Sequence, residues 1–189
     1  NPQLDITEIR QRKTVCPSTT GGINWNSIAY SPQTNALYAP TNNVCMDYYL
    51  NPVNPTVGGY HSSAVSRKIS VPDGDEQIGI FSAVEVASGK TLWTYKQRAA
   101  ITGSVLTTGG GLAFVTDDAR RFRAFDVDNG SILWEQVLNS SAGGFPSTYS
   151  VDGEQYVAIA AGGGVSHRAL TPEIQQRRGG NMLFVFKLP

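Results

Sequence analysis

Short apolar runs alternate with turn residues along almost the whole chain, and no run is long enough to cross a membrane. Runs of about four to eight residues, bounded by glycine, proline, asparagine or serine, are typical of short β-strands. The segments expected to be strands are residues 27–30, 36–39, 80–86, 91–96, 102–108, 112–116, 121–127, 131–138, 147–150, 155–161 and 182–188. Only residues 171–178 favour a helical turn or two. The pattern predicts an all-β protein.

The strand pattern contains an internal repeat. Residues 83–93 read AVEVASGKTLW and residues 124–134 read AFDVDNGSILW, so Gly89 and Gly130, like Trp93 and Trp134, are 41 residues apart (130 − 89 and 134 − 93). A period near forty made of short strands is typical of β-propeller blades. The glycine provides the left-handed backbone of a tight turn, and the tryptophan can lie flat between neighbouring sheets. We expect both tryptophans to be structural.

The 189 residues hold about four or five such blades, at roughly forty residues each. A propeller segment of this size leaves two sheet edges and two apolar faces open, which natural proteins avoid. We therefore expect part of the ring to lie outside this chain, whose first residues, Asn1 and Pro2, read as the middle of a longer protein. Residues 51–59 and 66–79, rich in proline, glycine and charge, are predicted to form a long loop between blades.

Composition narrows the function further. The 15 basic and 15 acidic residues balance, so electrostatics give no reason to expect nucleic acid or an anionic membrane as a partner. Cys16 and Cys45 are too few for a disulfide-rich scaffold, and His61 and His167 lie too far away in sequence for a zinc site. Two alternatives stay open for the cysteines: buried free thiols, or a structural disulfide if the protein lives outside the cytosol.

Several stretches resemble, in order, the quinoprotein alcohol dehydrogenases, which are eight-bladed propellers that use pyrroloquinoline quinone (PQQ). The GKTLW turn at residues 89–93 resembles the tryptophan-docking motif of that family. The further matching stretches are residues 16–17 (CP), 21–25 (GGINW), 29–32 (AYSP), 43–47 (NVCMD), 106–112 (LTTGGGL), 122–126 (FRAFD), 149–158 and 184–189 (FVFKLP). The resemblance covers nearly the whole chain.

The resemblance implies that residues 1–189 are the C-terminal portion of such a propeller. The enzymes of this family oxidise primary or secondary alcohols to aldehydes or ketones in the periplasm and pass electrons to a cytochrome c. They hold PQQ beside a calcium or lanthanide ion. Their general-base aspartate and metal ligands belong to earlier blades, so we expect the partners of this chain to include the N-terminal remainder of the ring, and the isolated chain to be catalytically inactive.

Three places in the chain match the cofactor pocket of the family. Asn24 matches the asparagine that hydrogen-bonds the quinone, and Trp25 is its neighbour. Gly162 and Gly163, in the triplet at residues 162–164, match a glycine-rich stretch beside the cofactor, and Phe114 matches an aromatic near it. Each has a structural alternative: a turn cap for the asparagine, packing at a blade junction for the tryptophan, a tight loop for the glycines, and a core position for the phenylalanine.

The resemblance also favours a disulfide between Cys16 and Cys45, since methanol-oxidising relatives carry one around this turn, where it would brace the Asn24 loop. The chain departs from the family at residues 117–121 (DDARR), where many relatives have an Asp-Gly turn. Asp117 and Asp118, like residue 47, are interpreted as solvated turn residues. No catalytic residue and no metal ligand is therefore assigned, and the absence of a CxxCH motif excludes c-type haem in this chain.

A different class of protein shares the blade repeat. Non-catalytic propellers, such as the scaffold lipoproteins of outer-membrane assembly, have the same docking tryptophans for architectural reasons, and a fold alone does not give a function. The motif at residues 21–25, between the two cysteines, distinguishes the hypotheses, because a scaffold has no reason to keep it. A carbohydrate- or peptide-binding propeller is supported only by surface aromatics such as Tyr48 and Tyr49.

Overall fold

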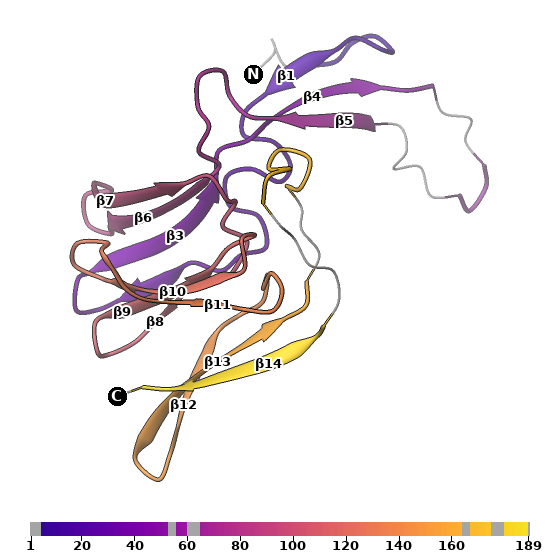
Figure 1. The fold of residues 1–189 in the computed structure, drawn as a ribbon. Coiled ribbons are helices and arrows are strands. Elements are labelled where there is room, and N and C mark those ends of the chain that lie inside the picture. The colour runs from indigo at the N-terminus through magenta and orange to yellow at the C-terminus, as the bar shows by residue number, and fades with distance from the viewer. Residues whose placement is uncertain (1–4, 53–55, 60–64, 164–166, 175–179, 189) are drawn as a thin grey trace.

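The computed structural model of the chain describes residues 5–52, 56–59, 65–163, 167–174 and 180–188, without the side chains of residues 65–68. These residues form four antiparallel sheets and no helix (Figure 1). We call them the first blade (β2-β3-β6-β7), the second blade (β8-β9-β10-β11), the third sheet (β12-β13-β14) and the side sheet (β1-β4-β5). The all-β propeller prediction is confirmed.

The strands of the side sheet are β1 (Lys13–Val15), β4 (Cys45–Leu50) and β5 (Val65–Ser70). Those of the first blade are β2 (Ala29–Ser31), β3 (Ala36–Asn42), β6 (Gly79–Glu85) and β7 (Thr91–Gln97). Those of the second blade are β8 (Leu106–Thr107), β9 (Leu112–Thr116), β10 (Arg121–Asp126) and β11 (Ile132–Val137). Those of the third sheet are β12 (Ser147–Val151), β13 (Glu154–Ala161) and β14 (Met182–Lys187).

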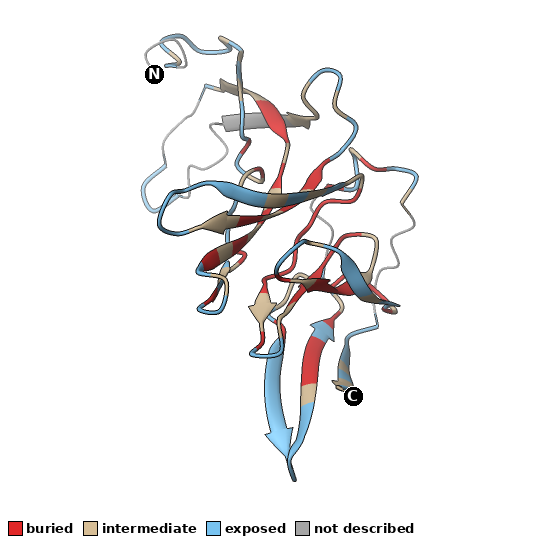
Figure 2. Ribbon diagram, turned by 90° about the vertical axis from the view of Figure 1, so that its left-hand side faces the viewer, coloured by how far each residue is buried: buried red, intermediate tan, exposed pale blue. Residues whose placement is uncertain are grey.

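The first blade, the second blade and the third sheet stack in series, as blades do in a propeller (Figure 1). Along β3, buried and half-buried residues alternate, so one face of the first blade is fully covered and the other face only partly. In β9 and β10 four consecutive residues are buried, so the second blade is covered on both faces. The third sheet is open on its outer side, where β12 is exposed throughout in the hairpin at the bottom of Figure 2.

Two hydrophobic clusters fill the two interfaces of this stack. The cluster between the first and second blades contains Tyr38, Phe81, Ile101, Val115 and Phe125 among others. The cluster between the second blade and the third sheet contains Phe114, Phe122, Leu138, Val157 and Ile159 among others. Because side chains alternate between the two faces of a strand, adjacent residues of β9 contribute to different clusters.

The sequence repeat corresponds to a repeat in three dimensions. Gly89 and Gly130 occupy equivalent hairpin turns with φ of 70° and 73°. Each donates its N–H to the carbonyl of the acidic residue four positions earlier, at 2.9 and 3.0 Å. The strand register shifts directly after Ala83 in one blade and directly after Ala124 in the other, again 41 residues apart (124 − 83). Each repeat is thus one hairpin with the same bulge.

The repeated tryptophans pack between sheets, as predicted. The indole Nε1 of Trp93 donates a hydrogen bond to the carbonyl oxygen of Val127 in the second blade, at 2.9 Å. Its ring lies against Gly130, where a Cβ atom would be 2.6 Å from the ring. Trp134 contacts Phe186 of the third sheet edge-on, with ring centroids 5.0 Å apart.

The side sheet corrects part of the sequence interpretation. Residues 51–59 and 66–79 were expected to form a long loop, but residues 66–70 belong to β5, which pairs with β4 along its whole length. The charged pair at residues 67–68 interrupts the apolar alternation of this strand, which hides its signal in the sequence. The chain therefore leaves the first blade after β3, adds β4 and β5 to β1 in the side sheet, and returns as β6 (Figure 1).

Candidate functional site

The loop at residues 21–25 is fastened to the end of β3. Gly22 and Asn42 exchange both backbone hydrogen bonds, at 2.8 and 3.0 Å. Gly21 lies so close to Val44 that a Cβ atom there would be 2.6 Å from the Val44 carbonyl oxygen. The two glycines of the motif therefore allow the backbone to lie directly on the strand. This fixes the position of the backbone that leads to Asn24 and Trp25.

A disulfide closes the other side of this loop. Cys16 and Cys45 are bonded, with their Cα atoms 4.4 Å apart, as the resemblance implied. Two residues after the first cysteine, the N–H of Ser18 donates to the Val44 carbonyl at 2.7 Å. The covalent link and the backbone bonds thus hold residues 16–22 against the start of β4.

The loop presents Asn24 and Trp25 at the surface. The Asn24 amide donates from Nδ2 to the backbone carbonyl of Thr19 at 2.9 Å, a bond within the same loop. The Trp25 side chain is 56% exposed, which is unusual for a residue with so much apolar surface. An exposed indole on a loop that is held in place is typical of a binding site.

Trp25 forms one wall of a pocket of about 680 Å³. The other lining residues belong to two glycine pairs, to β13, and to the start of β14 with the residue before it; they are Gly143, Gly144, Ala160, Ala161, Gly162, Gly163, Asn181, Met182 and Leu183. The structure therefore brings together Trp25, Gly162 and Gly163, three of the residues predicted from the sequence. Asn24 precedes the tryptophan in the same loop but does not line the pocket. Residue 164, the last of the glycine triplet, lies outside the described residues.

The glycine wall is held in place by Ser141. Its backbone carbonyl accepts hydrogen bonds from Gly162 and Gly163 at 3.1 and 3.3 Å, and its hydroxyl donates to the Gly163 carbonyl at 3.2 Å. Gly162 has a φ of 135° and lies against Asn181, whose Oδ1 would be 2.1 Å from a Cβ atom at this position. Only glycine combines that backbone conformation with that approach. The glycine part of the pocket wall is therefore made of backbone.

Phe114 lies elsewhere. It is 2% exposed and belongs to the cluster between the second blade and the third sheet. It pairs with Ala124 across the second blade, just as Tyr38 pairs with Ala83 across the first. Since Tyr38 is fully buried at a blade interface, Phe114 occupies the core position of its own blade. The structure does not bring it to the Trp25 pocket.

Asp117 is buried, contrary to the expectation of a solvated turn residue. It is 1% exposed and forms a salt bridge to the Arg123 guanidinium at 2.7 Å. Gln97, on β7, donates to the same carboxylate at 3.0 Å, so the group ties the two blades together. Burial raises the pKa of Asp117 above its ordinary value, against the opposing effects of Arg123, the Arg121 N–H and Gln97.

Asp118 is likewise buried, at 0% exposure. Its Oδ1 accepts a hydrogen bond from the Thr102 hydroxyl at 2.8 Å, and its Oδ2 lies 3.8 Å from Nδ1 of the buried His167. The turn that carries both aspartates places Arg120 at a φ of 69°, a conformation in which glycine is more usual. This explains how a hairpin forms here without an Asp-Gly pair.

Within the described ranges, no group of three or more histidine, cysteine, aspartate or glutamate residues is arranged to hold a metal ion. Residue 61, the other histidine, is outside those ranges. No helix in the described part of the chain has the length and apolar character needed to cross a membrane.

Comparison with known proteins shows the family of the chain. Residues 75–157 match the family of PQQ glucose, ethanol and alcohol dehydrogenases, beta-propeller domain. The chain is 33% identical over 180 residues to quinoprotein alcohol dehydrogenase PedH of Pseudomonas putida, an alignment that covers 93% of this chain and 30% of the relative. It is 35% identical over 182 residues to 1-butanol dehydrogenase (quinone) of Thauera butanivorans, covering 93% and 28%.

The chain belongs to the PQQ-dependent alcohol dehydrogenase family. It spans about 30% of the length of these relatives. Its fold superposes on the europium-containing methanol dehydrogenase with a TM-score of 0.84 at 29% identity, covering 96% of this chain and 36% of that one. It also superposes on the quinohemoprotein alcohol dehydrogenase from Comamonas testosteroni, with a TM-score of 0.77 at 26% identity. That match covers 94% of this chain and 28% of that one. The four sheets are thus a segment of a quinoprotein dehydrogenase propeller.

Sequence reasoning missed part of the pocket in this quinoprotein segment. Ser141, Asn181 and the glycine pair at residues 143–144 were not singled out, although all four lie in its wall or support it. The glycine pair is visible in the sequence as a possible close approach of backbone. Asn181 and Ser141 carry no local signal, because their roles depend on which strands the fold places side by side.

Proposed function

We propose that the chain is the C-terminal portion of a PQQ-dependent alcohol dehydrogenase that oxidises primary or secondary alcohols to aldehydes or ketones. The observation that carries the proposal is the pocket in which the exposed Trp25 ring meets the backbone wall of Gly162 and Gly163. The disulfide-braced loop at residues 21–25 provides the asparagine beside it. A scaffold propeller has no use for such a pocket.

The pocket residues fit a flat polycyclic ligand such as PQQ. An indole ring offers a stacking surface, and such aromatic contacts contribute about 0.5–1.5 kcal/mol beyond area burial. Glycines, with no side chain, let a planar molecule lie against backbone. Asn181 fills the space where a Cβ of Gly162 would lie, so a ligand would contact that glycine from another side. When bound, PQQ supplies the quinone carbonyl that accepts the hydride from the alcohol.

The roles of the chain's own residues follow from where they lie. Trp25 binds one face of the cofactor and excludes water from it. Asn24 lies outside the pocket wall but next to Trp25, and one N–H of its amide is used by the Thr19 carbonyl; its second N–H is proposed to donate to a cofactor oxygen at the edge of the pocket without adding charge. Ser141 keeps Gly162 and Gly163 at a fixed height and so sets the width of the pocket.

The remaining parts of the enzyme are proposed to come from blades outside this chain. These blades supply the general base and the ligands of a calcium or lanthanide ion. The open faces of the stack support the idea, because Leu183 on the third sheet is 66% exposed and Val185 is 46% exposed. The free edge of three-stranded β12-β13-β14 can accept a fourth strand from the N-terminal remainder of the ring.

A periplasmic location and a cytochrome c acceptor complete the proposal. The disulfide is compatible with an oxidising compartment. Methanol dehydrogenase [cytochrome c] subunit 1 of Methylobacterium organophilum is 33% identical to the chain over 156 residues, which supports a cytochrome c as the electron acceptor.

Equilibrium dialysis of PQQ against the whole protein, in the presence of calcium, tests the site. Trp25→Ala and Asn24→Ala are each expected to weaken PQQ binding about tenfold, which is the loss of one stacking contact or charge-assisted hydrogen bond. Phe114→Leu, a conservative change in the core, is the control and is expected to bind like the unsubstituted protein. If Trp25→Ala and Asn24→Ala both bind PQQ as tightly as the unsubstituted protein does, the Trp25 pocket is not the cofactor site.

A further inference from the structure

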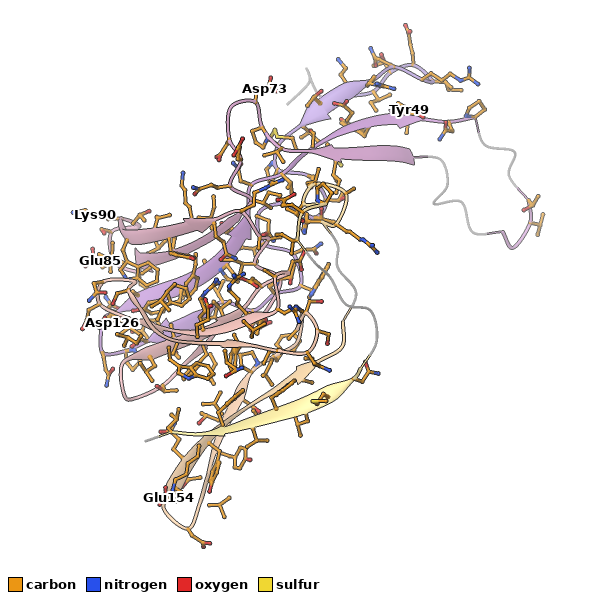
Figure 3. All side chains as sticks on the ribbon, viewed as in Figure 1. Tyr49, Asp73, Glu85, Lys90, Asp126 and Glu154 are labelled. Atoms are coloured by element: carbon orange, nitrogen blue, oxygen red, sulfur yellow. A yellow bond between two sulfur atoms is a disulfide. The ribbon has the colours of Figure 1, made fainter. Side chains whose placement is uncertain are left out.

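The side sheet carries a second pocket, which lies apart from the Trp25 site. It has a volume of about 360 Å³ and is lined by Arg10, Arg12, Tyr49 and Asn51. We call it the arginine pocket. Tyr49 lies on the part of the side sheet that projects from the stack of blades (Figure 3). Nothing in the proposed dehydrogenase activity uses this surface.

The pocket is formed by local backbone structure. The N–H of Arg10 donates to the carbonyl of Leu50 at 2.9 Å, which holds the segment before β1 against the end of β4. Arg10 itself adopts a φ of 63°, a left-handed conformation that is unfavourable for a non-glycine residue. Strain of this kind concentrates at functional sites, where the surrounding structure maintains it.

The second arginine is positioned by an aromatic ring. The Arg12 guanidinium carbon lies 5.6 Å from the centroid of the Tyr49 ring, within the range of a cation–π contact. Such a contact orients the planar guanidinium but leaves its N–H donors available, because the ring provides no hydrogen-bond acceptor at its face. Arg12 is therefore held in place, and among the described residues its guanidinium has no hydrogen-bond acceptor.

The charges in the pocket are not balanced by the protein. Neither guanidinium forms an ion pair with a carboxylate of the described residues, although the chain as a whole has no net charge. Elsewhere in the described part, Arg98, Arg121 and Arg123 have carboxylate partners, whereas Arg120 donates to the Leu138 carbonyl. Two like charges lining one small hollow repel each other, and an anion between them relieves that repulsion.

We infer that the arginine pocket binds a small oxyanion, with a phosphate or carboxylate group bridging Arg10 and Arg12. Guanidinium groups match the geometry of both anions through paired N–H donors. The pocket volume suits a small molecule rather than a chain segment, and its wall is polar on the arginine side. Phosphate and carboxylate offer the same chemistry to the pocket, and the test distinguishes them.

Isothermal titration calorimetry of the full chain with sodium phosphate and with sodium succinate, at low ionic strength, tests the inference. Saturable one-to-one binding of at least one anion is expected. Arg12→Gln and Arg10→Gln are each expected to raise its Kd about tenfold, the effect of losing one charge-assisted contact. A lower Kd for phosphate than for succinate indicates a ligand that carries a phosphate group. A lower Kd for succinate indicates a ligand that carries a carboxylate.

Lys90→Gln is the matched control, because it also removes one exposed positive charge, in the turn between β6 and β7. It is expected to change the Kd by less than about twofold. Circular dichroism spectra that are the same for all variants confirm that these surface substitutions leave the fold intact. The inference is overturned if neither anion binds, if the arginine variants bind like the unsubstituted chain, or if the control weakens binding equally.

Discussion

Trp93 of the first blade donates its indole N–H to the carbonyl oxygen of Val127 in the second blade, at 2.9 Å. The same carbonyl accepts a hydrogen bond from the hydroxyl of the buried Tyr38, at 3.0 Å. One backbone oxygen of the second blade thus receives two donors from the first. Because the tryptophan ring also lies against Gly130, the repeat glycine serves the turn of its own blade and the packing of the preceding one.

Gly130 is therefore expected to tolerate substitution less well than Gly89, its counterpart in the repeat. Both have a left-handed φ, so alanine costs the same backbone strain at either position. A Cβ at Gly130 collides with Trp93, whereas a Cβ at Gly89 meets nothing within 4 Å. Gly130→Ala should destabilise the chain by about 1–3 kcal/mol more than Gly89→Ala, the cost of overpacking, in urea unfolding. Equal losses would contradict the docking role of Trp93.

The same pair of variants tests whether blades precede this segment. If the ring continues before the first blade, a tryptophan of the preceding blade lies on Gly89 as Trp93 lies on Gly130. In the complete propeller, Gly89→Ala should then become as destabilising as Gly130→Ala, measured by the shift in Tm relative to the unsubstituted protein. A Gly89→Ala effect that is the same in the chain and in the complete protein would argue against a docked neighbour.

Removal of the disulfide is expected to destabilise the chain. Cys16 and Cys45 are 29 residues apart, and closing a loop of that length contributes roughly 3–4 kcal/mol in the chain-entropy description. The variant Cys16→Ser/Cys45→Ser should lose this amount in urea unfolding. Reduction of the unsubstituted chain should reproduce the loss, while reductant should leave the double variant unchanged. A double variant as stable as the unsubstituted chain would show that the loop needs no brace.

The buried salt bridge between Arg123 and Asp117 should be costly to break from one side. Arg123 is 6% exposed and Asp117 is 1% exposed, so Arg123→Met leaves a buried carboxylate without its charged partner. Such a change costs about 3–5 kcal/mol. The double variant Arg123→Met/Asp117→Asn should recover part of the loss, because no buried charge then remains. If the double variant is no more stable than Arg123→Met in urea unfolding, the pair is not coupled.

Glu135 should make stability fall as the pH falls. Partial burial raises its pKa, but hydrogen bonds and attraction from Arg123 and Arg121 outweigh this and lower the pKa below its ordinary value. A carboxyl with a lowered pKa in the folded state contributes stability above its unfolded pKa and loses it as the pH falls through the folded value. Glu135→Gln should therefore cost more stability at about pH 7 than at about pH 3. An equal cost at both pH values would contradict the shift.

The blade hairpins could be predicted from the sequence because their signals are local. The turn glycines and the period of 41 residues depend on residues within one or two strands, and the structure confirms them. The side sheet could not be predicted in the same way. β1 pairs with β4 across more than thirty residues, and charged residues interrupt the alternation of β5.

The candidate site was predicted in part, for a similar reason. The motif at residues 21–25 and the glycines at residues 162–163 are recognisable as sequences, and the fold brings Trp25 and both glycines to one pocket. Phe114 and Asp117 show where such reasoning stops. Whether an aromatic lies in the core, or a turn aspartate meets a buried arginine, depends on the neighbouring blade, which the local sequence does not specify.

Intact-mass spectrometry of the protein purified from its own host, under denaturing conditions, tests the central claim most directly. A functional quinoprotein dehydrogenase is predicted to yield polypeptide beyond the 20.3 kDa of this chain, either as one longer chain or as a second one, together with a released small molecule of the mass of PQQ. A single species of 20.3 kDa with no quinone released would contradict the claim, and would leave the segment related to these dehydrogenases by descent alone.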